Sequence, residues 1–193
     1  MGLWKAITGR SEPVRADLDA LFEVPSAAII LETEMGLSPV GEASVCYRAA
    51  GGAAFHHTQR EAIELLEADP DAPAVRTTTD DFGFTWLTVT AGETDPVDVA
   101  GLCTDLHAVN TALEGAGFGP ALLCTLVPFA DPGGRTVGLV YLYKQGTFYA
   151  FAPTGPQQRD NLTEIALRDA LSAELPMEKD LSRWLAVWEA PGL

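Results

Sequence analysis

The sequence is poor in basic side chains. Lysine and arginine together number 12, against 27 aspartates and glutamates, so the formal net charge of the 193 residues is −15. Binding to the phosphates of nucleic acid requires clustered lysine and arginine, and so does electrostatic docking on an anionic membrane. The few basic residues are scattered, which argues against both. The acidic surface either steers a basic segment of a protein partner or simply keeps the protein soluble.

Cysteine is scarce as well, and long apolar runs are missing. The three cysteines, Cys46, Cys103 and Cys124, are too few and odd in number for a disulfide scaffold. We therefore interpret them as small buried residues in a reducing compartment. No apolar run approaches the roughly 18 residues that span a bilayer, and the first residues lack the apolar region of a signal peptide. We expect a cytoplasmic protein.

Signatures of catalysis and of cofactor binding are also missing. The chain contains no CxxC, HExxH or GxSxG motif, and it lacks the GKS or GKT sequence of a Walker A loop. Cys103 and His107 lie one turn apart on an expected helix, and His56 adjoins His57, but no further ligand completes a metal site around them. We therefore predict that the protein is not an enzyme and uses no metal or cofactor.

Hydrophobic periodicity and turn residues predict helices and strands in groups. Helices are expected at 14–22, 58–68, 95–116, 161–175 and 178–188. Capping boxes at 58–61 and 161–164, with Thr58 and Asn161 as the caps, open the second and fourth of these helices, and glycines at 115 and 117 end the third. Strands are expected at 26–33, 42–49, 74–79, 84–90, 121–129, 136–143 and 147–151. Tight turns join the last three strands into a meander in the C-terminal half. Strands in adjacent sets favour an α+β fold, with an antiparallel sheet flanked by helices.

The domain organisation follows from these elements. Residues 1–12 are expected to form an N-terminal arm, and 13–193 to form one α+β domain, or two lobes joined by helix 95–116. The arm carries Leu3, Trp4 and Ile7, which form an amphipathic turn that either packs on the body, frays or touches lipid.

Two groups of aromatic residues are candidates for binding a protein partner. Trp184 and Trp188 are four residues apart on the last expected helix, and indole rings are enriched at binding hot spots. The last hairpin of the meander carries Tyr143, Phe148 and Tyr149 on its two faces. One face must pack inward, and the other is an exposed aromatic patch unless a helix covers it. The alternative is that both groups close the core of the protein itself.

A pocket for a small molecule is the rival hypothesis. His107 and Asn110 lie close together on the longest expected helix and, with tyrosines, could line an enclosed pocket for a ligand or a substrate. Asn110 also borders the apolar stripe of this helix, which is typical of a buried amide held by backbone groups. Both interpretations of Asn110 stay open at the level of sequence.

Blocks of sequence along nearly the whole chain match one protein family. They are LDALF at 18–22, PSAA at 25–28, TDLHAVNT at 104–111, AGFG at 116–119, VYLYK at 140–144, GTFY at 146–149, FAPTG at 151–155, RDN at 159–161 and APGL at 190–193. By these blocks the chain resembles the PspA-associated protein family PspAB. The resemblance implies an accessory of phage shock protein A, a coiled-coil protein of membrane stress, and it brings no assigned active site.

The expected fold is also similar to secretion-chaperone-like folds, which are small acidic α+β proteins that bind other chains. Taken with the family resemblance, this predicts a cytoplasmic, non-enzymatic adaptor of the envelope stress response. It would bind a coiled-coil homologue of phage shock protein A, with an acidic surface for steering and an aromatic patch for affinity. Contact with the inner face of the membrane would be indirect, through this partner, and the protein itself would be a monomer or a homodimer.

Overall fold

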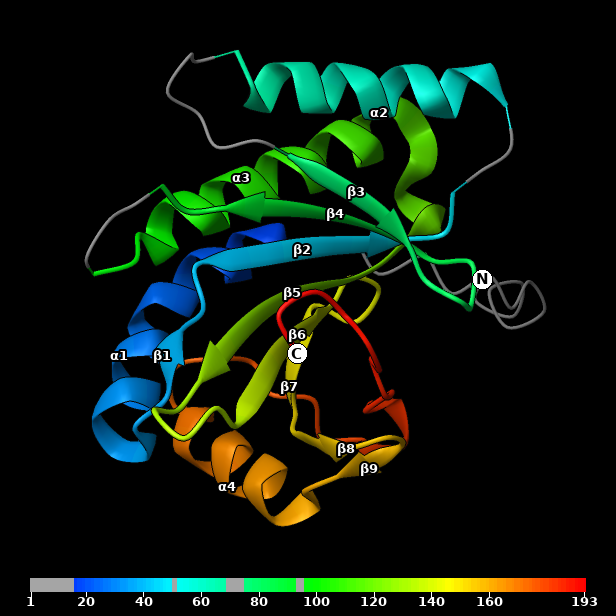
Figure 1. Ribbon diagram of the computed structural model, residues 1–193. Coiled ribbons are helices and arrows are strands. Elements are labelled where there is room, and N and C mark those ends of the chain that lie inside the picture. Colours follow the sequence, from blue (N-terminus) through cyan, green and yellow to red (C-terminus); the bar gives the residue numbers. More distant parts are fainter. Residues whose placement is uncertain (1–15, 50–51, 69–74, 93–95) are drawn as a thin grey trace, which may run out of the picture.

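The computed structural model describes residues 16–49, 52–68, 75–92 and 96–193 (Figure 1). The predicted arm 1–12, with Leu3, Trp4 and Ile7, lies outside the described residues. In the described part of the chain, helices pack on a sheet of antiparallel strands, so the predicted α+β fold class is confirmed.

The sheet has seven strands, of which six follow the order β3-β4-β2-β5-β6-β7 while β1 pairs with β5. Its strands are β1 (Ser38–Pro39), β2 (Glu42–Tyr47), β3 (Arg76–Thr79), β4 (Thr85–Thr90), β5 (Leu122–Ala130), β6 (Thr136–Leu142) and β7 (Thr147–Phe151). A separate ribbon consists of β8 (Pro153–Gly155) and β9 (Gln158–Arg159). Turns at 131–134 and 145–146 join β5, β6 and β7, which confirms the predicted meander.

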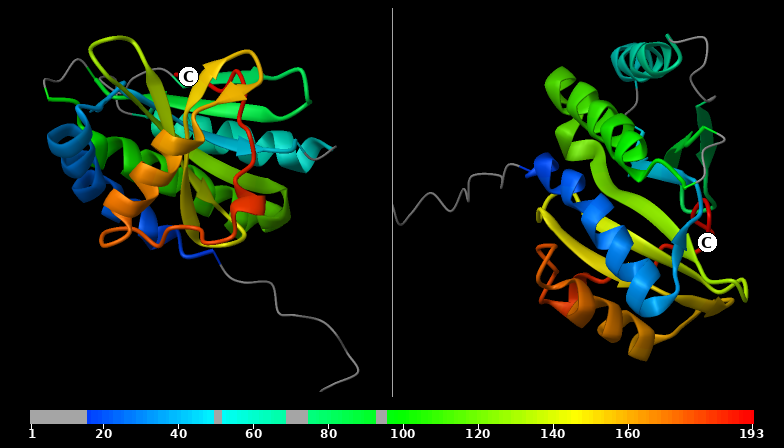
Figure 2. Two further views of the ribbon diagram at one scale, coloured as in Figure 1. Left: turned by 90° about the horizontal axis from the view of Figure 1, so that it is seen from below. Right: turned by 90° about the vertical axis from the view of Figure 1, so that its left-hand side faces the viewer.

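Helices cover one face and one edge of the sheet. They are the 3-10 helix η1 (Leu18–Glu23), α1 (Val24–Met35), α2 (Ala53–Leu66), α3 (Val99–Leu113) with its irregular extension η2 (Glu114–Phe118), the short η3 (Gly119–Ala121), α4 (Asn161–Leu171) and η4 (Leu181–Arg183). Both α1 and α3 lie on one face, α2 stacks on α3, and α4 lies beside β7 (Figure 1; Figure 2). The predicted helix 95–116 is α3, which begins after Asp98 caps it. Within the described ranges, none of the helices has both the length and the apolar character to cross a bilayer.

Apolar side chains occupy both faces of the sheet. The larger core fills the space between the sheet and the helices. The opposite face carries a smaller buried cluster that includes Cys46, Trp86, Cys124, Leu126, Val140, Tyr149 and Phe151. Residues 184–193, here called the C-terminal strap, cover this second cluster with Trp184, Val187, Trp188, Ala190 and Leu193. The strap crosses the front of the sheet as the red segment of Figure 1.

The strand predicted at 26–33 is wrong, because this segment belongs to helix α1. Its buried residues are Val24, Ala27, Ala28 and Leu31, which recur at the helical spacing, while Ile29 is exposed. The proline at position 25 lies in the first turn, where its missing N–H costs nothing, so it begins the helix instead of ending one. The helix predicted at 14–22 is accordingly displaced to η1, directly before α1.

The helix predicted at 178–188 is also wrong. Apart from the short 3-10 helix η4, this segment is irregular and forms neither helix nor strand. In a helix, the carbonyls of Trp184 and Leu185 would accept from later backbone N–H groups. Here they accept from the Arg159 Nη1 (2.8 Å) and from the Tyr149 hydroxyl (2.8 Å) instead. Side chains of the sheet and its neighbouring ribbon thus replace the local hydrogen bonds that a helix would need.

The helix predicted from a capping box at Thr58 begins earlier, at Ala53. The extra turn brings Phe55 into the core, where its ring lies 5.5 Å from that of Tyr47 and 4.9 Å from that of Phe118. Burial of a phenylalanine side chain is worth about 1.5–3 kcal/mol. This contact therefore outweighs the gain of about 1 kcal/mol that a capping residue gives.

The start of α4 also differs from the expected capping box. The Asp160 carboxylate caps the helix by accepting from the first free backbone N–H groups, whereas Asn161 was predicted to do so. The expected partner in that box, Glu164, is buried and instead receives two bonds from the Arg159 Nε, at 2.8 and 3.0 Å. A residue expected on a helix surface is therefore part of the interior.

Candidate functional site

His107 lies half-buried on α3, facing η1. Its Nε2 is 3.4 Å from the Asp19 Oδ1, and its ring centroid is 4.9 Å from that of Phe22. Asp19 itself is largely exposed, so this pair is screened by water. The contact joins a helix to a neighbouring 3-10 helix and provides no enclosed space for a ligand.

Asn110 is buried and ties α3 to the sheet. Its Nδ2 donates to the Leu106 carbonyl (2.8 Å) and to the Thr125 Oγ1 (3.1 Å). The buried amide expected from the sequence is therefore present, with a helix carbonyl and a strand hydroxyl as its acceptors. Neither Asn110 nor His107 lines any of the four cavities described for this structure, so the structure does not gather them around a pocket.

Substituting Asn110→Ala is expected to lower the free energy of unfolding by about 1–3 kcal/mol. The change removes the amide that donates to the Leu106 carbonyl and to the Thr125 hydroxyl in the protein interior. Urea denaturation of the two proteins measures this change. The control is Thr104→Ala on the exposed side of the same helix, with an expected change within about 0.5 kcal/mol. Equal effects of the two substitutions would contradict the assignment of Asn110 as a buried tie.

The aromatic residues predicted to bind a partner differ in exposure. Tyr143 and Phe148 are buried in the helix-side core. Tyr149 is buried beneath the strap, and Trp184 is the buried first residue of the strap. Their ring centroids are 6.0 Å apart. Trp188 is partly buried, with its ring edge-to-face against Phe151 at 4.9 Å. Of the five, Trp188 is the residue that keeps accessible surface for a partner.

Burial keeps the hydroxyl of Tyr149 neutral. Removal from water raises the pKa of Tyr149 above its usual range, so the group stays protonated and donates to the Leu185 carbonyl. The Trp184 Nε1 similarly donates to the Glu178 carbonyl at 3.1 Å. Both polar atoms on these buried rings are therefore satisfied, which fixes the strap on the sheet.

Two adjoining cavities lie beside the strap and together form what we call the strap groove. The first has a volume of about 450 Å³ and is lined mainly by apolar residues: Cys46, Asp80, Phe82, Phe84, Trp86, Leu123, Cys124, Leu142, Tyr149, Gln157, Leu185, Ala186, Val187 and Trp188. The second, of about 600 Å³, lies between the strap, β8 and the β3–β4 turn. They share Phe82, Gln157, Val187 and Trp188.

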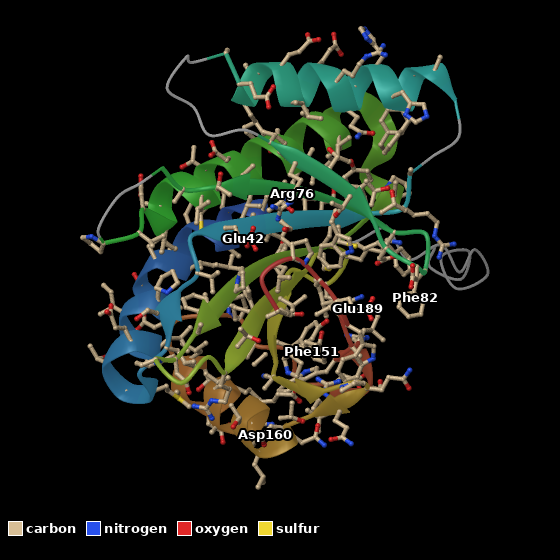
Figure 3. All side chains as sticks on the ribbon, viewed as in Figure 1. Glu42, Arg76, Phe82, Phe151, Asp160 and Glu189 are labelled. Atoms are coloured by element: carbon tan, nitrogen blue, oxygen red, sulfur yellow. The ribbon has the colours of Figure 1, made fainter. Side chains whose placement is uncertain are left out.

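Two large apolar side chains at the rim of the strap groove are exposed. Phe82, at the tip of the β3–β4 turn, is 66% exposed, and Leu185 of the strap is 63% exposed. Figure 3 shows Phe82 and Glu189 at this rim, with Phe151 behind the strap. Apolar groups exposed beside a hollow surface mark an interaction site.

The backbone of the groove is strained at two places. Gln157 has φ 54° and Glu189 has φ 58°, both in the left-handed region that residues with a side chain rarely adopt. Both line the second cavity. Strain of this kind costs about 1–3 kcal/mol and concentrates at binding surfaces, where the surrounding structure must hold it in place.

Asp80 holds the turn that presents Phe82. Its Oδ1 accepts from the backbone N–H groups of Phe82 (3.0 Å) and Phe84 (2.9 Å), and its Oδ2 accepts from the Trp86 Nε1 (3.0 Å). The carboxylate thus shapes the wall of the groove. The turn falls between the two strands predicted at 74–79 and 84–90. Phe82 was not among the predicted binding residues, and its place as an aromatic residue at the tip of a turn is the signal that could have marked it.

The cysteines are all buried, as expected, and none is in a disulfide. Cys103 lies in the helix-side core, while Cys46 and Cys124 line the strap groove. Among the described residues, no three His, Cys, Asp or Glu side chains are grouped so that they could hold a metal ion. His56 and His57 are on α2, where the His57 Nε2 lies 3.4 Å from the Glu61 Oε1 of the same helix.

A family model described as PspA associated protein B matches residues 1–192, which is essentially the whole chain. No curated protein and no solved structure matches it. The similarity to secretion-chaperone-like folds therefore stays a prediction.

Proposed function

The chain belongs to the PspA associated protein B family, and from this premise we propose that it is a non-enzymatic adaptor that binds a coiled-coil homologue of phage shock protein A. The binding site is the strap groove. In the cell, the adaptor works in the cytoplasm during envelope stress and reaches the inner face of the membrane through this partner. The family name supports the association with PspA, and the groove supports the place of contact.

The observation that carries the proposal is the exposed apolar rim of the strap groove. Phe82, Leu185 and Trp188 come from a turn and from the strap, and they border two cavities that are open beside them. An amphipathic helix binds such a surface by placing its apolar side chains in the hollow. A coiled-coil protein consists of helices of this type, so its chemistry fits the groove.

The charge of the chain suits a partner with basic residues beside its apolar seam. The chain carries a net charge of −15, and Asp81 and Glu189 are exposed where they line the second cavity. Complementary charge speeds the encounter of two proteins, while apolar contacts supply most of the affinity. The acidic surface therefore orients the partner, and the aromatic rim holds it.

Binding of the purified coiled-coil partner tests the proposal, with isothermal titration calorimetry as the measurement. Phe82→Ala and Trp188→Ala are each expected to raise the Kd about 10- to 30-fold, because truncating a central aromatic residue costs roughly 1.4–2 kcal/mol of binding. The matched control is Leu65→Ala, which removes an equally exposed apolar side chain from α2 and should leave the Kd unchanged.

Two outcomes would reject the proposed function. The first is an absence of binding between the partner and the folded wild-type chain. The second is a loss of affinity in Leu65→Ala as large as in Phe82→Ala, which would place the contact elsewhere. Phe82 is exposed, so its removal should not unfold the protein, and circular dichroism of each variant verifies this.

A further inference from the structure

Two of the three cysteines face each other across neighbouring strands. Cys46 of β2 and Cys124 of β5 are direct partners in the antiparallel register, beside an irregularity in the pairing after Cys46. Residues opposite each other in an antiparallel pair lie on the same face, with Cα atoms about 4.5 or 5.5 Å apart. Either separation falls within the range of about 4.4–6.8 Å that a disulfide bond spans. The spacing of paired strands therefore suits a disulfide between these two residues.

The two thiols are also in contact and can be reached. The Cys124 thiol is close enough to raise the pKa of Cys46. Cys46 is 3% exposed and Cys124 is 8% exposed, and both line the first cavity of the strap groove. A molecule as small as a peroxide can approach them through this cavity. Cys103 of α3 lines none of the four cavities and is fully buried, so it provides an internal comparison.

We propose that Cys46 and Cys124 form a redox modification site, in which a peroxide converts the two thiols into a disulfide that links β2 to β5. This site is independent of the proposed adaptor function, since it requires no partner. Oxidation would lock the floor of the strap groove by a covalent bond.

The chemistry balances with hydrogen peroxide as the oxidant. Cys124, the more exposed residue, loses its proton to water, and its sulfur attacks one peroxide oxygen. The O–O bond breaks, the departing hydroxide takes up a proton to become water, and Cys124 becomes a sulfenic acid. Cys46 then loses its proton, and its sulfur attacks the Cys124 sulfur. The S–O bond breaks and a second hydroxide leaves as water, so two thiols and one peroxide give one disulfide and two waters.

The surroundings favour the disulfide over a lasting thiolate. The neighbouring Cys124 thiol, burial and the negative charge of Asp80 all raise the pKa of Cys46. The Cys46 thiolate is therefore scarce at neutral pH, which slows its attack on the Cys124 sulfenic acid, whereas the disulfide carries no charge and suits the apolar cavity. The pair should consequently respond to sustained oxidation and not to brief exposure.

Treating the folded wild-type chain with hydrogen peroxide tests the proposal. The number of thiols that react with iodoacetamide after denaturation should fall from three to one, and peptide mass spectrometry should find the 46–124 link with Cys103 still free. Dithiothreitol should restore all three thiols. In Cys46→Ser, which lacks the second thiol, dimedone should label the sulfenic acid at Cys124.

The matched control is Cys103→Ser, which removes the cysteine outside the groove and should still form the 46–124 link, with no thiol left free. Near-ultraviolet circular dichroism verifies that each variant is folded, and the wild-type measurement stands without any variant. The proposal is overturned if folded wild-type protein yields no 46–124 link after prolonged oxidation. It is also overturned if Cys103 is lost as fast as Cys124.

Discussion

Replacing Glu164 with alanine is expected to lower the free energy of unfolding by about 3–5 kcal/mol, because the change leaves a partly buried arginine without its counter-charge. The Glu164 Oε1 accepts from the Arg159 Nε at 2.8 Å and from the backbone N–H of Ala152 at 2.9 Å. Arg159 also donates from Nη1 to the Trp184 carbonyl, so the same group holds the strap. Urea denaturation followed by circular dichroism measures the change.

Asp169→Ala is the matched control for this substitution. Asp169 forms an ion pair with Arg168 on the same helix, at 2.7 Å, but its side chain is exposed. Surface pairs of this kind contribute about 0–1 kcal/mol, so the control should change the stability little. A loss in Glu164→Ala no larger than in Asp169→Ala would show that the buried pair does not anchor the strap.

Truncating Trp184 to alanine is expected to lower the free energy of unfolding by about 3–5 kcal/mol. The indole is 7% exposed, lies against Tyr149 and donates to the Glu178 carbonyl. Its removal leaves a cavity under the strap and deprives the Glu178 carbonyl of its indole donor. Thermal and urea unfolding measure the loss, and limited proteolysis should cut the loosened strap faster than in the wild type.

Leu185→Ala provides the comparison next to it in the chain. Leu185 is largely exposed, and the carbonyl that accepts from Tyr149 belongs to its backbone, so truncation of the side chain leaves this bond intact. The expected change in stability is within about 0.5 kcal/mol. If Leu185→Ala and Trp184→Ala lowered stability alike, the strap would not be held by the buried indole.

The predicted partner-binding residues differ in where the fold places them. Trp188 was singled out from the sequence because indoles are common at binding surfaces, and it does line the strap groove. The other residues predicted to bind a partner are buried in the two cores, an alternative that the sequence left open; they are Tyr143, Phe148, Tyr149 and Trp184. Alternation along a strand separates two faces, but it does not tell which of them a distant segment will cover.

Local patterns were sufficient where the information is local. Turn residues and alternation predicted the meander β5–β6–β7, and helical periodicity with a glycine-rich end predicted α3, because these signals act between neighbours in the chain. The grouping of the strands also predicted the α+β class. None of these features depends on a contact with a remote segment.

Tertiary contacts decided the rest. The run at 26–33 is apolar enough for a strand or a helix, and packing against the sheet and α3 selected the helix. The apolar spacing of the segment 178–188 is that of a helix. Two of its carbonyls accept hydrogen bonds from the side chains of Arg159 and Tyr149 instead, and the segment is not helical. The strap groove, and the meeting of Cys46 with Cys124, likewise exist only in the folded chain. A hydrogen bond or a hydrophobic contact between distant segments contributes as much free energy as a local preference, so the sequence determined the candidates and the packing chose among them.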